Sequence, residues 1–341
     1  MTVRVEHPET AGGSLLRIAL VGYGRWGTNV ARDLASTEGA ALTHVVDVNP
    51  QALSRAAKAH PSAAVAIKLA DVVDAVDAVA ICTPPTTHAV LASAALAASK
   101  HVFVEKPIAM DVSAATLLEA AAAARRRVLM VGHQMLYHGA FEALVRVVSS
   151  LELGALRAVH SERSGMVDAS RDPDVLWAYG PHDIAMLLAL AGRPPLEIRA
   201  AGSARVGAPE IDEVALEVRF DGGLAGTTLL RGRSAARVRR LTAICERGEV
   251  VFDDSVPCGT CTIRRDGEVG SAAVRFDGGD GRLPLARELA DFVTCALSGA
   301  RPRSDGRHGI HVTRVLVEDE RMIAASRPAT SSSFRLSRAL S

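Results

Sequence analysis

The first 133 residues alternate between short apolar runs and longer segments of helical character, and this rhythm constrains the fold more than any other feature. The apolar runs lie at residues 17–21, 41–46, 78–82, 101–104 and 128–131. Asp111 is a candidate N-cap for one of the intervening helices, which we expect to reach about Arg126. Strands that alternate with helices of about 10–15 residues are typical of a parallel sheet. We therefore predict an α/β domain with a doubly wound parallel sheet over residues 1–133.

After residue 133 the pattern changes to a series of strands framed by helices. We expect helices near 139–149, 178–191, 284–298 and 307–326, and strands at 198–201, 211–220, 224–231, 238–245, 250–252 and 260–265. Gly222-Gly223 and Arg247-Gly248 are candidate hairpin turns. These elements predict a second α/β domain, residues 134–327, with a large, open, mostly antiparallel sheet. Its exposed sheet favours a homodimer or homotetramer, and residues 328–341 are expected to form a flexible tail.

Composition excludes several classes of function. The 341 residues suit about two domains, and 39 basic against 38 acidic residues argue against a nucleic-acid binder. The apolar runs fall short of the roughly 20 residues that a membrane span needs, and residues 1–9 lack the apolar core of a secretory signal. The five cysteines are few and odd in number, which favours the cytoplasm. Cys258-Gly-Thr-Cys261 has no second pair, so we expect two thiols in a loop and no metal.

A glycine-rich motif connects the first predicted strand to the first helix. It consists of Gly22, Tyr23, Gly24, Arg25, Trp26 and Gly27. In such a motif the first glycine permits a tight turn, the second lets the backbone approach a pyrophosphate, and the third lets helix and sheet pack closely. The helix N-terminus adds free N–H groups for the phosphates. We predict that these six residues bind a dinucleotide.

Asp47, at the end of the second strand, bears on which dinucleotide is bound. A carboxylate at this position can accept hydrogen bonds from both ribose hydroxyls of NAD and repels the 2′-phosphate of NADP. The alternative is that Asp47 caps the helix that begins near Pro50. We expect NAD in preference to NADP.

Two further loops follow strands at the edge where open α/β sheets bind ligands. Thr83 and Pro84 belong to the first, although a Pro-Pro pair also simply ends one element and starts another. Lys106 belongs to the second and is one of only four lysines among 39 basic residues. An ammonium there can donate a hydrogen bond to the oxygen on a carbon that exchanges hydride. The alternative is a surface lysine that caps a strand.

Four stretches of the chain together resemble the glucose–fructose oxidoreductase/inositol dehydrogenase family, Gfo/Idh/MocA. They are residues 21–27, 82–88, 104–108, which contain Glu105-Lys106-Pro107, and 177–184, and they span about half of the chain in matching order. Residues 131–138 further resemble the branch that acts on nucleotide-linked or amino sugars. The resemblance implies a Rossmann domain followed by an open-faced α/β domain. It also implies oxidation or reduction at a secondary alcohol of a sugar or cyclitol. Together with Asp47, this predicts an NAD-dependent oxidoreductase.

The resemblance also implies roles for particular residues. Lys106 would contact the reacting oxygen and, with Glu105, border the nicotinamide; His88 belongs to the cofactor stretch; and His182 would be the acid/base. A substrate pocket is expected around Tyr137, His138, Arg163 and Trp177. Arg163 could pair with a phosphate or carboxylate of the substrate, and a scaffold salt bridge explains it equally well.

The chain departs from the family pattern at Ala178, where the family commonly has an Asp four residues before the histidine. Residues i and i+4 share a helix face, so that Asp could position His182 and stabilise its charged form. Three possibilities follow: Lys106 and His182 act alone or with Tyr179, Asp172 or Asp174 fills the space, or the enzyme mainly reduces a ketone. The rival functions are an NADPH-dependent ketoreductase and a cofactor-binding sensor or scaffold with reduced turnover.

Overall fold

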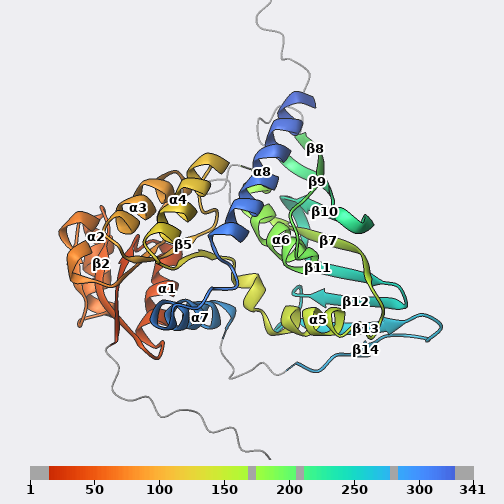
Figure 1. Ribbon diagram of the computed structural model, residues 1–341, viewed down its shortest axis with the longest axis horizontal. Coiled ribbons are helices and arrows are strands. Elements are labelled where there is room, and N and C mark those ends of the chain that lie inside the picture. The colour runs from red at the N-terminus through yellow and green to blue at the C-terminus, as the bar shows by residue number, and fades with distance from the viewer. Residues whose placement is uncertain (1–14, 168–173, 205–210, 277–282, 327–341) are drawn as a thin grey trace, which may run out of the picture.

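The computed structural model describes residues 15–167, 174–204, 211–276 and 283–326. The first sheet lies in the left half of Figure 1. Its strands are parallel and follow the order β3-β2-β1-β4-β5-β6. Its strands are β1 (Leu16–Val21), β2 (Ala40–Val46), β3 (Ala64–Ala66), β4 (Ala78–Ile81), β5 (His101–Glu105) and β6 (Leu129–Gly132). Its helices are α1 (Arg25–Ala35), α2 (Pro50–Ala59), α3 (Pro85–Ala97) and α4 (Val112–Ala124). The predicted doubly wound α/β fold is confirmed.

Polar side chains set the starts of these helices. Asp111 caps α4 by accepting a hydrogen bond from the Ala114 amide at 2.7 Å, as the sequence predicts. Asn49 caps α2 by accepting from Gln51 and Ala52. The alternative interpretation of Asp47 as the cap of α2 is therefore wrong.

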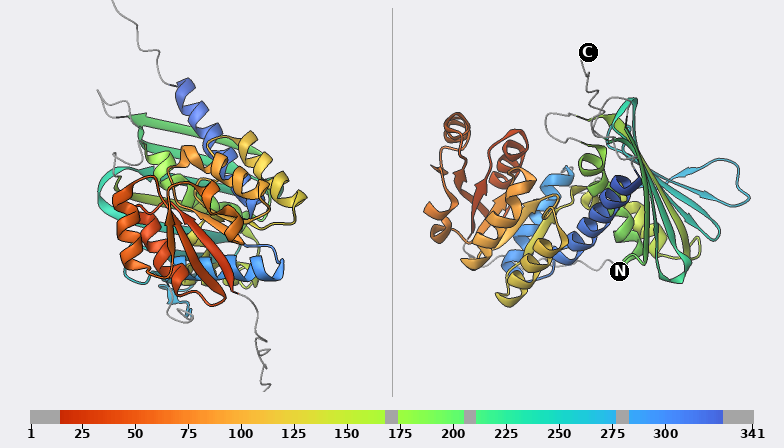
Figure 2. Two further views of the ribbon diagram at one scale, coloured as in Figure 1. Left: turned by 90° about the vertical axis from the view of Figure 1, so that its left-hand side faces the viewer. Right: turned by 90° about the horizontal axis from the view of Figure 1, so that it is seen from above.

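The second sheet has eight strands in the order β14-β13-β12-β11-β7-β10-β9-β8. They are β7 (Leu156–Met166), β8 (Glu197–Ala204), β9 (Ile211–Arg219), β10 (Ala225–Arg231), β11 (Arg233–Cys245), β12 (Gly248–Asp253), β13 (Thr260–Arg265) and β14 (Ala272–Ala273). All neighbours are antiparallel except β7 and β10. The helices of this half are α5 (Gly139–Ser149), α6 (Val175–Ala191), α7 (Pro284–Ser298) and α8 (Gly306–Ser326). Figure 2 shows α6 and α8 between this sheet and the first domain, and none of the described helices lies over the other face.

The central strand β7 is absent from the sequence-based prediction. Several of the β7 residues that face the core are polar: Ser161, Arg163 and Ser164 are all buried. A strand is recognised in a sequence by apolar residues on one face, and here polar residues occupy part of that face. Of the two cysteines expected in a loop, Cys258 is exposed in the turn before β13, as expected, whereas Cys261 is buried within β13.

The two halves are packed together through one continuous apolar core. It extends from β1 and α1 through the 3₁₀ turn Gln134–Tyr137 and α6 into the second sheet. Helix α7 belongs to the C-terminal half of the chain but packs against α1 and β1 of the first domain. Figure 1 shows α7 beside α1. Within the described ranges, no helix combines the length and the apolar character needed to cross a bilayer.

Candidate active site

The glycine-rich loop has the geometry that each of its glycines requires. Gly22 has a φ of +94°, and a Cβ there would lie 2.7 Å from the carbonyl oxygen of Cys82. A Cβ on Gly27 would lie only 1.9 Å from the Gly22 carbonyl oxygen. Gly24 has no atom within 4 Å of its ideal Cβ position and stands at the N-cap of α1. The loop therefore leaves an open space beside Gly24, at the N-terminus of a helix, where a phosphate can approach the backbone.

Asp47 ties this loop to the end of β2. Its carboxylate accepts hydrogen bonds from the Tyr23 amide at 2.6 Å and from the Asn49 amide at 2.8 Å. Tyr23 itself is 2% exposed, and its ring meets that of His60 edge-on. Each carboxylate oxygen keeps a lone pair beyond these bonds. Asp47 is therefore fixed in orientation and still able to accept hydrogen bonds from a ribose.

His88 links the two loops that follow β4 and β5. It is fully buried, with Nδ1 2.7 Å from the Pro107 carbonyl oxygen and Nε2 2.8 Å from the Thr83 carbonyl oxygen. Both ring nitrogens are thus committed to the main chain. These contacts make His88 a residue that holds the Thr83-Pro84 loop against the Lys106-Pro107 loop, and they give its predicted contact with a cofactor no support.

Glu105 is a buried acid at the carboxyl end of β5. It accepts a hydrogen bond from the Trp26 indole and a longer one, at 3.3 Å, from the Lys106 amide. Burial raises the pKa of this carboxyl to about 7, although the Trp26 hydrogen bond and the Lys106 charge oppose the rise. The hydrogen bond between Trp26 and Glu105 joins the glycine-rich motif at the start of α1 to the predicted catalytic loop.

Lys106 and His182 come together across the junction of the two domains. The Lys106 ammonium donates a hydrogen bond to the carbonyl oxygen of Ala178 at 3.3 Å. Ala178 lies one helical turn before His182 on α6. The His182 Nδ1 is buried with no hydrogen-bond partner among the described residues. Burial above all, then the charges of Lys106 and Arg163, lower the pKa of His182 well below its usual value. The imidazole is therefore neutral near pH 7.

Of the two other acids considered for the space at Ala178, the structure describes only Asp174, and that residue is engaged elsewhere. Asp174 is the N-cap of α6 and accepts from the Trp177 amide at 3.1 Å. Asp172 lies outside the described residues. Tyr179 is partly buried, with its hydroxyl 3.1 Å from the ideal Cβ position of Gly165.

The residues predicted to line the substrate pocket are engaged elsewhere. The Tyr137 hydroxyl donates to Asp291 at 2.7 Å, and the Trp177 indole donates to Glu320 at 3.2 Å. His138 caps α5 and lies 3.5 Å from Asp254. These contacts account for the three side chains as parts of the scaffold, and they give the predicted substrate role no support.

Arg163 forms a buried ion pair with Asp183, with each side chain at most 4% exposed. The pair joins β7 to α6 beside His182. The scaffold interpretation of Arg163 accounts for this contact, since the carboxylate of Asp183 already faces the guanidinium.

Sequence reasoning missed His133 and Arg239. His133 follows β6 as Lys106 follows β5, and the register pairs Glu105 with Gly132, so the two side chains leave neighbouring strand ends. Both ring nitrogens of His133 are buried without a partner in the described part of the chain. The position of His133 directly after a strand could have marked it as a candidate site residue in the sequence. Arg239 of β11 pairs with Asp254 at 3.1 Å and contributes to the positive surroundings of His182, and no local pattern marks it.

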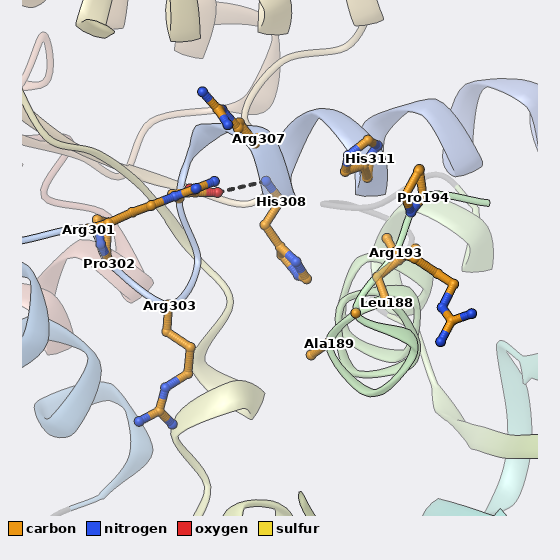
Figure 3. Close-up of a pocket in the computed structure, with 12 residues that line it drawn as sticks. Leu188, Ala189, Arg193, Pro194, Arg301, Pro302, Arg303, Arg307, His308 and His311 are labelled. Carbon is orange, nitrogen blue, oxygen red and sulfur yellow. Dashed lines mark hydrogen bonds and ion pairs between the residues drawn. The ribbon is translucent and has the colours of Figure 1, made fainter. Parts of the chain in front are cut away.

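A pocket of about 340 Å³ lies apart from these residues, between the end of α6 and the start of α8 (Figure 3). Four arginines line it, but in Figure 3 the guanidinium groups of Arg193, Arg303 and Arg307 point away from one another. Arg303 and Arg307 face the acids Glu142 and Glu119. The arginines therefore do not converge on a common ligand position. Among the described residues no group of three or more His, Cys, Asp or Glu could hold a metal ion.

Comparison with known proteins assigns the family. Residues 16–133 match the model of the GFO_IDH_MocA oxidoreductase family, NAD-binding Rossmann fold. The chain is 33% identical over 197 residues to UDP-N-acetylglucosamine 3-dehydrogenase of Acidithiobacillus ferrooxidans, an alignment that covers 56% of this chain and 59% of that one. It is 35% identical over 167 residues to inositol 2-dehydrogenase of Cereibacter sphaeroides, covering 48% of each.

These two alignments thus reach only about half to three fifths of the relatives' length. The likeness of the folds extends further. The solved structure of the A. ferrooxidans enzyme superposes with a TM-score of 0.81 at 26% identity, over 91% of this chain and 98% of that one. The chain belongs to the Gfo/Idh/MocA family of oxidoreductases.

Proposed function

We propose that this protein is an NAD-dependent oxidoreductase that acts on a secondary alcohol, or the matching ketone, of a sugar, cyclitol or nucleotide-linked sugar. The observation that carries the proposal is the convergence of Lys106 and His182 at the edge of the first sheet where the glycine-rich loop opens. The relatives named above act on UDP-N-acetylglucosamine and inositol, and both are rich in secondary hydroxyls.

The dinucleotide site fits NAD better than NADP. The glycine loop provides a backbone approach and a helix N-terminus for the pyrophosphate. The Asp47 carboxylate, held by two amides, suits ribose hydroxyls and repels a 2′-phosphate. When bound, the nicotinamide supplies the site that accepts or gives the hydride.

Lys106 and His182 divide the remaining work. The Lys106 ammonium donates a hydrogen bond to the substrate oxygen and stabilises the negative charge that develops there. In alcohol oxidation the neutral His182 accepts the hydroxyl proton as the C–H hydride leaves, and in ketone reduction a proton is returned to the oxygen. Glu105 lies next to Lys106, and its ionised form compensates the Lys106 charge.

A second candidate is a ketoreductase, using NADPH or NADH, in which Lys106 gives the proton. It is favoured by the surroundings of His182, where Lys106, Arg163, His133 and Arg239 all oppose a positive imidazolium. Proton transfer from Lys106 to the nascent alkoxide would remove one positive charge from that cluster, whereas alcohol oxidation through His182 would add one.

We also propose that the helix-free face of the second sheet joins copies of this chain into a homodimer or homotetramer. That face carries alternating arginines and acids, among them the pairs of Arg231 with Glu162 and Arg240 with Asp253. Light scattering of the purified protein would test the assembly.

The experiment is a hydride-transfer screen on purified protein. NAD or NADP with free sugars, inositols and nucleotide-linked sugars, and NADH or NADPH with their keto forms, are followed by the absorbance of reduced nicotinamide. Lys106→Met should abolish turnover and keep cofactor binding. Lys100→Met, at the opposite end of β5, is the matched control and should change neither. Full turnover of Lys106→Met with any substrate would overturn the mechanism, and cofactor binding without turnover across the panel would favour a sensor.

A further inference from the structure

The indole of Trp26 has a hydrogen-bond partner outside its own helix. Trp26 is the second residue of α1, within the glycine-rich motif, and its Nε1–H donates to the carboxyl of Glu105 at the end of β5. The ring of Trp26 is partly buried and packs against the apolar core that joins the two halves of the chain. The N–H group is thus committed to Glu105, while the ring serves packing. The two parts of this side chain can therefore be tested separately.

Glycine at position 132 leaves room for the Glu105 carboxyl. The parallel register sets Gly132 of β6 beside Glu105. A Cβ on Gly132 would lie 3.0 Å from the carboxyl carbon and 3.0 Å from each carboxyl oxygen of Glu105. Because the three distances are equal, the plane of the carboxyl faces the main chain of Gly132. The carboxyl therefore occupies a space that a side chain at position 132 would narrow, and Trp26 reaches the same carboxyl from α1.

The carboxyl of Glu105 in turn holds the main chain that carries Lys106. The Lys106 amide donates to Glu105 at 3.3 Å. On the other side of the lysine, the Pro107 carbonyl oxygen lies 2.7 Å from Nδ1 of His88 on α3. The main chain is therefore held on both sides of Lys106, once by His88 and once by the carboxyl to which Trp26 donates. Loss of the indole hydrogen bond would weaken one of these two supports.

The groups around Glu105 leave its carboxylate dependent on few contacts. Lys106 and the Trp26 N–H favour the ionised form, whereas burial opposes it and raises the pKa to about 7. The Cys82 thiol and the Glu288 carboxyl of α7 also lie near Glu105, and burial raises the pKa of both well above the usual values. Burial thus favours the neutral form of both, so the charge that faces Glu105 is that of Lys106.

We propose that Trp26 is a positioning residue for hydride transfer: its indole N–H fixes the Glu105 carboxyl over Gly132 and thereby holds Lys106 at the reacting oxygen. This inference rests on the proposed function. Trp26 acts through Glu105, so loss of the N–H should slow hydride transfer and leave cofactor binding intact. A displacement of about 1 Å in a catalytic group can cost about a hundredfold in rate.

The kinetic test is Trp26→Phe, which removes the N–H and keeps an aromatic ring for packing. With NAD and either inositol or UDP-N-acetylglucosamine, kcat should fall at least about tenfold. The dissociation constant for NAD, measured by calorimetric titration, should stay within about twofold of wild type. In the background of Glu105→Leu, which cannot accept a hydrogen bond, Trp26→Phe should cost less than about twofold, because the two side chains act as one unit. Additive losses, or an unchanged kcat in Trp26→Phe, overturn the proposal.

The emission of Trp26 gives a second readout that needs no turnover. The chain has two tryptophans, so Trp177→Phe leaves only Trp26, whose emission should change with a midpoint near pH 7 as Glu105 ionises. The transition should be absent when Glu105→Gln is added, and absent from Trp26→Phe, the matched variant that keeps only Trp177. Gly132→Ala in the Trp177→Phe background displaces the carboxyl and weakens the hydrogen bond, so the midpoint should rise by at least about 0.3 pH unit.

The outcomes separate this proposal from the proposed function. Failure of the wild type to bind NAD refutes the proposed function, and the emission titration does not depend on it. An emission without a transition near pH 7, or with one that survives Glu105→Gln, overturns the link between Trp26 and Glu105 whatever the turnover. If the wild type binds NAD and turns over neither substrate, the emission titration decides alone. If Trp26→Phe fails to fold, Gly132→Ala replaces it in the kinetic test, where an unchanged kcat overturns the proposal.

Discussion

Gly24 and Gly27 allow a stringent test of the cofactor loop, because the structure makes opposite demands at the two positions. A methyl group on Gly27 would lie 1.9 Å from the main-chain oxygen of Gly22. Real Cβ atoms stay at least 3.0 Å from such an atom, so α1 and the loop must separate by about 1 Å. A methyl group on Gly24 meets nothing within 4 Å, and the φ of −77° suits alanine.

The free energies of unfolding should differ accordingly. Gly27→Ala gains up to about 1 kcal/mol of helix propensity but introduces a clash that costs about 3 kcal/mol or more. Gly24→Ala gains about 0.4–1 kcal/mol through the unfolded chain and loses a similar amount because alanine is a poor N-cap. We therefore expect Gly24→Ala to lie within about 0.5 kcal/mol of wild type, and Gly27→Ala to be about 2 kcal/mol less stable.

The affinity for NAD should separate the variants in a different way. The Gly24 methyl group occupies the open space that the pyrophosphate would enter, so Gly24→Ala should lose at least about tenfold in affinity, or about 1.4 kcal/mol. Urea unfolding and calorimetric titration measure the two quantities. Unchanged stability of Gly27→Ala would contradict the close approach of loop and helix. Full affinity in Gly24→Ala would mean that the pyrophosphate does not lie there.

Three further variants test buried charges. Ala178→Asp places a carboxylate four residues before His182, so we expect a higher imidazole pKa and an acidic limb of the oxidation pH–rate profile displaced to higher pH. Asp183→Asn leaves Arg163 as a buried uncompensated cation and should cost about 3–5 kcal/mol in urea unfolding, with far less lost when Arg163→Met is added. Burial raises the pKa of Asp319 from 3.8, the value of an exposed carboxyl, to about 8. The folded state therefore keeps the full stabilisation from neutral Asp319 below pH 3.8 and loses it as the pH rises toward 8. In thermal denaturation, Asp319→Asn should be more stable than wild type at pH 8 and equal to it near pH 4.

The sequence predicts those elements whose buried positions are apolar. The bounds expected for α5, α7 and β13 are those of the structure, because turns or caps and apolar faces mark them clearly. The same reasoning fails for β7, where Arg163 and two serines face inward, and for α7 as a partner of the first sheet. Which sheet a distant helix covers depends on tertiary packing, and local periodicity carries no such information.

The electrostatic balance at His182 is likewise a property of the assembled fold. The four side chains that oppose its ionisation come from four different strands or strand ends. The carboxylates near it are already paired, Asp183 with Arg163 and Asp254 with Arg239. With alanine at position 178, an imidazolium at His182 has no carboxylate of its own among the described residues. Negative charge must then be supplied by the substrate if the reaction is to run as an oxidation. Nucleotide-linked sugars, which carry phosphates, are accordingly the first members of the substrate panel to assay, and their advantage over neutral sugars should shrink in Ala178→Asp.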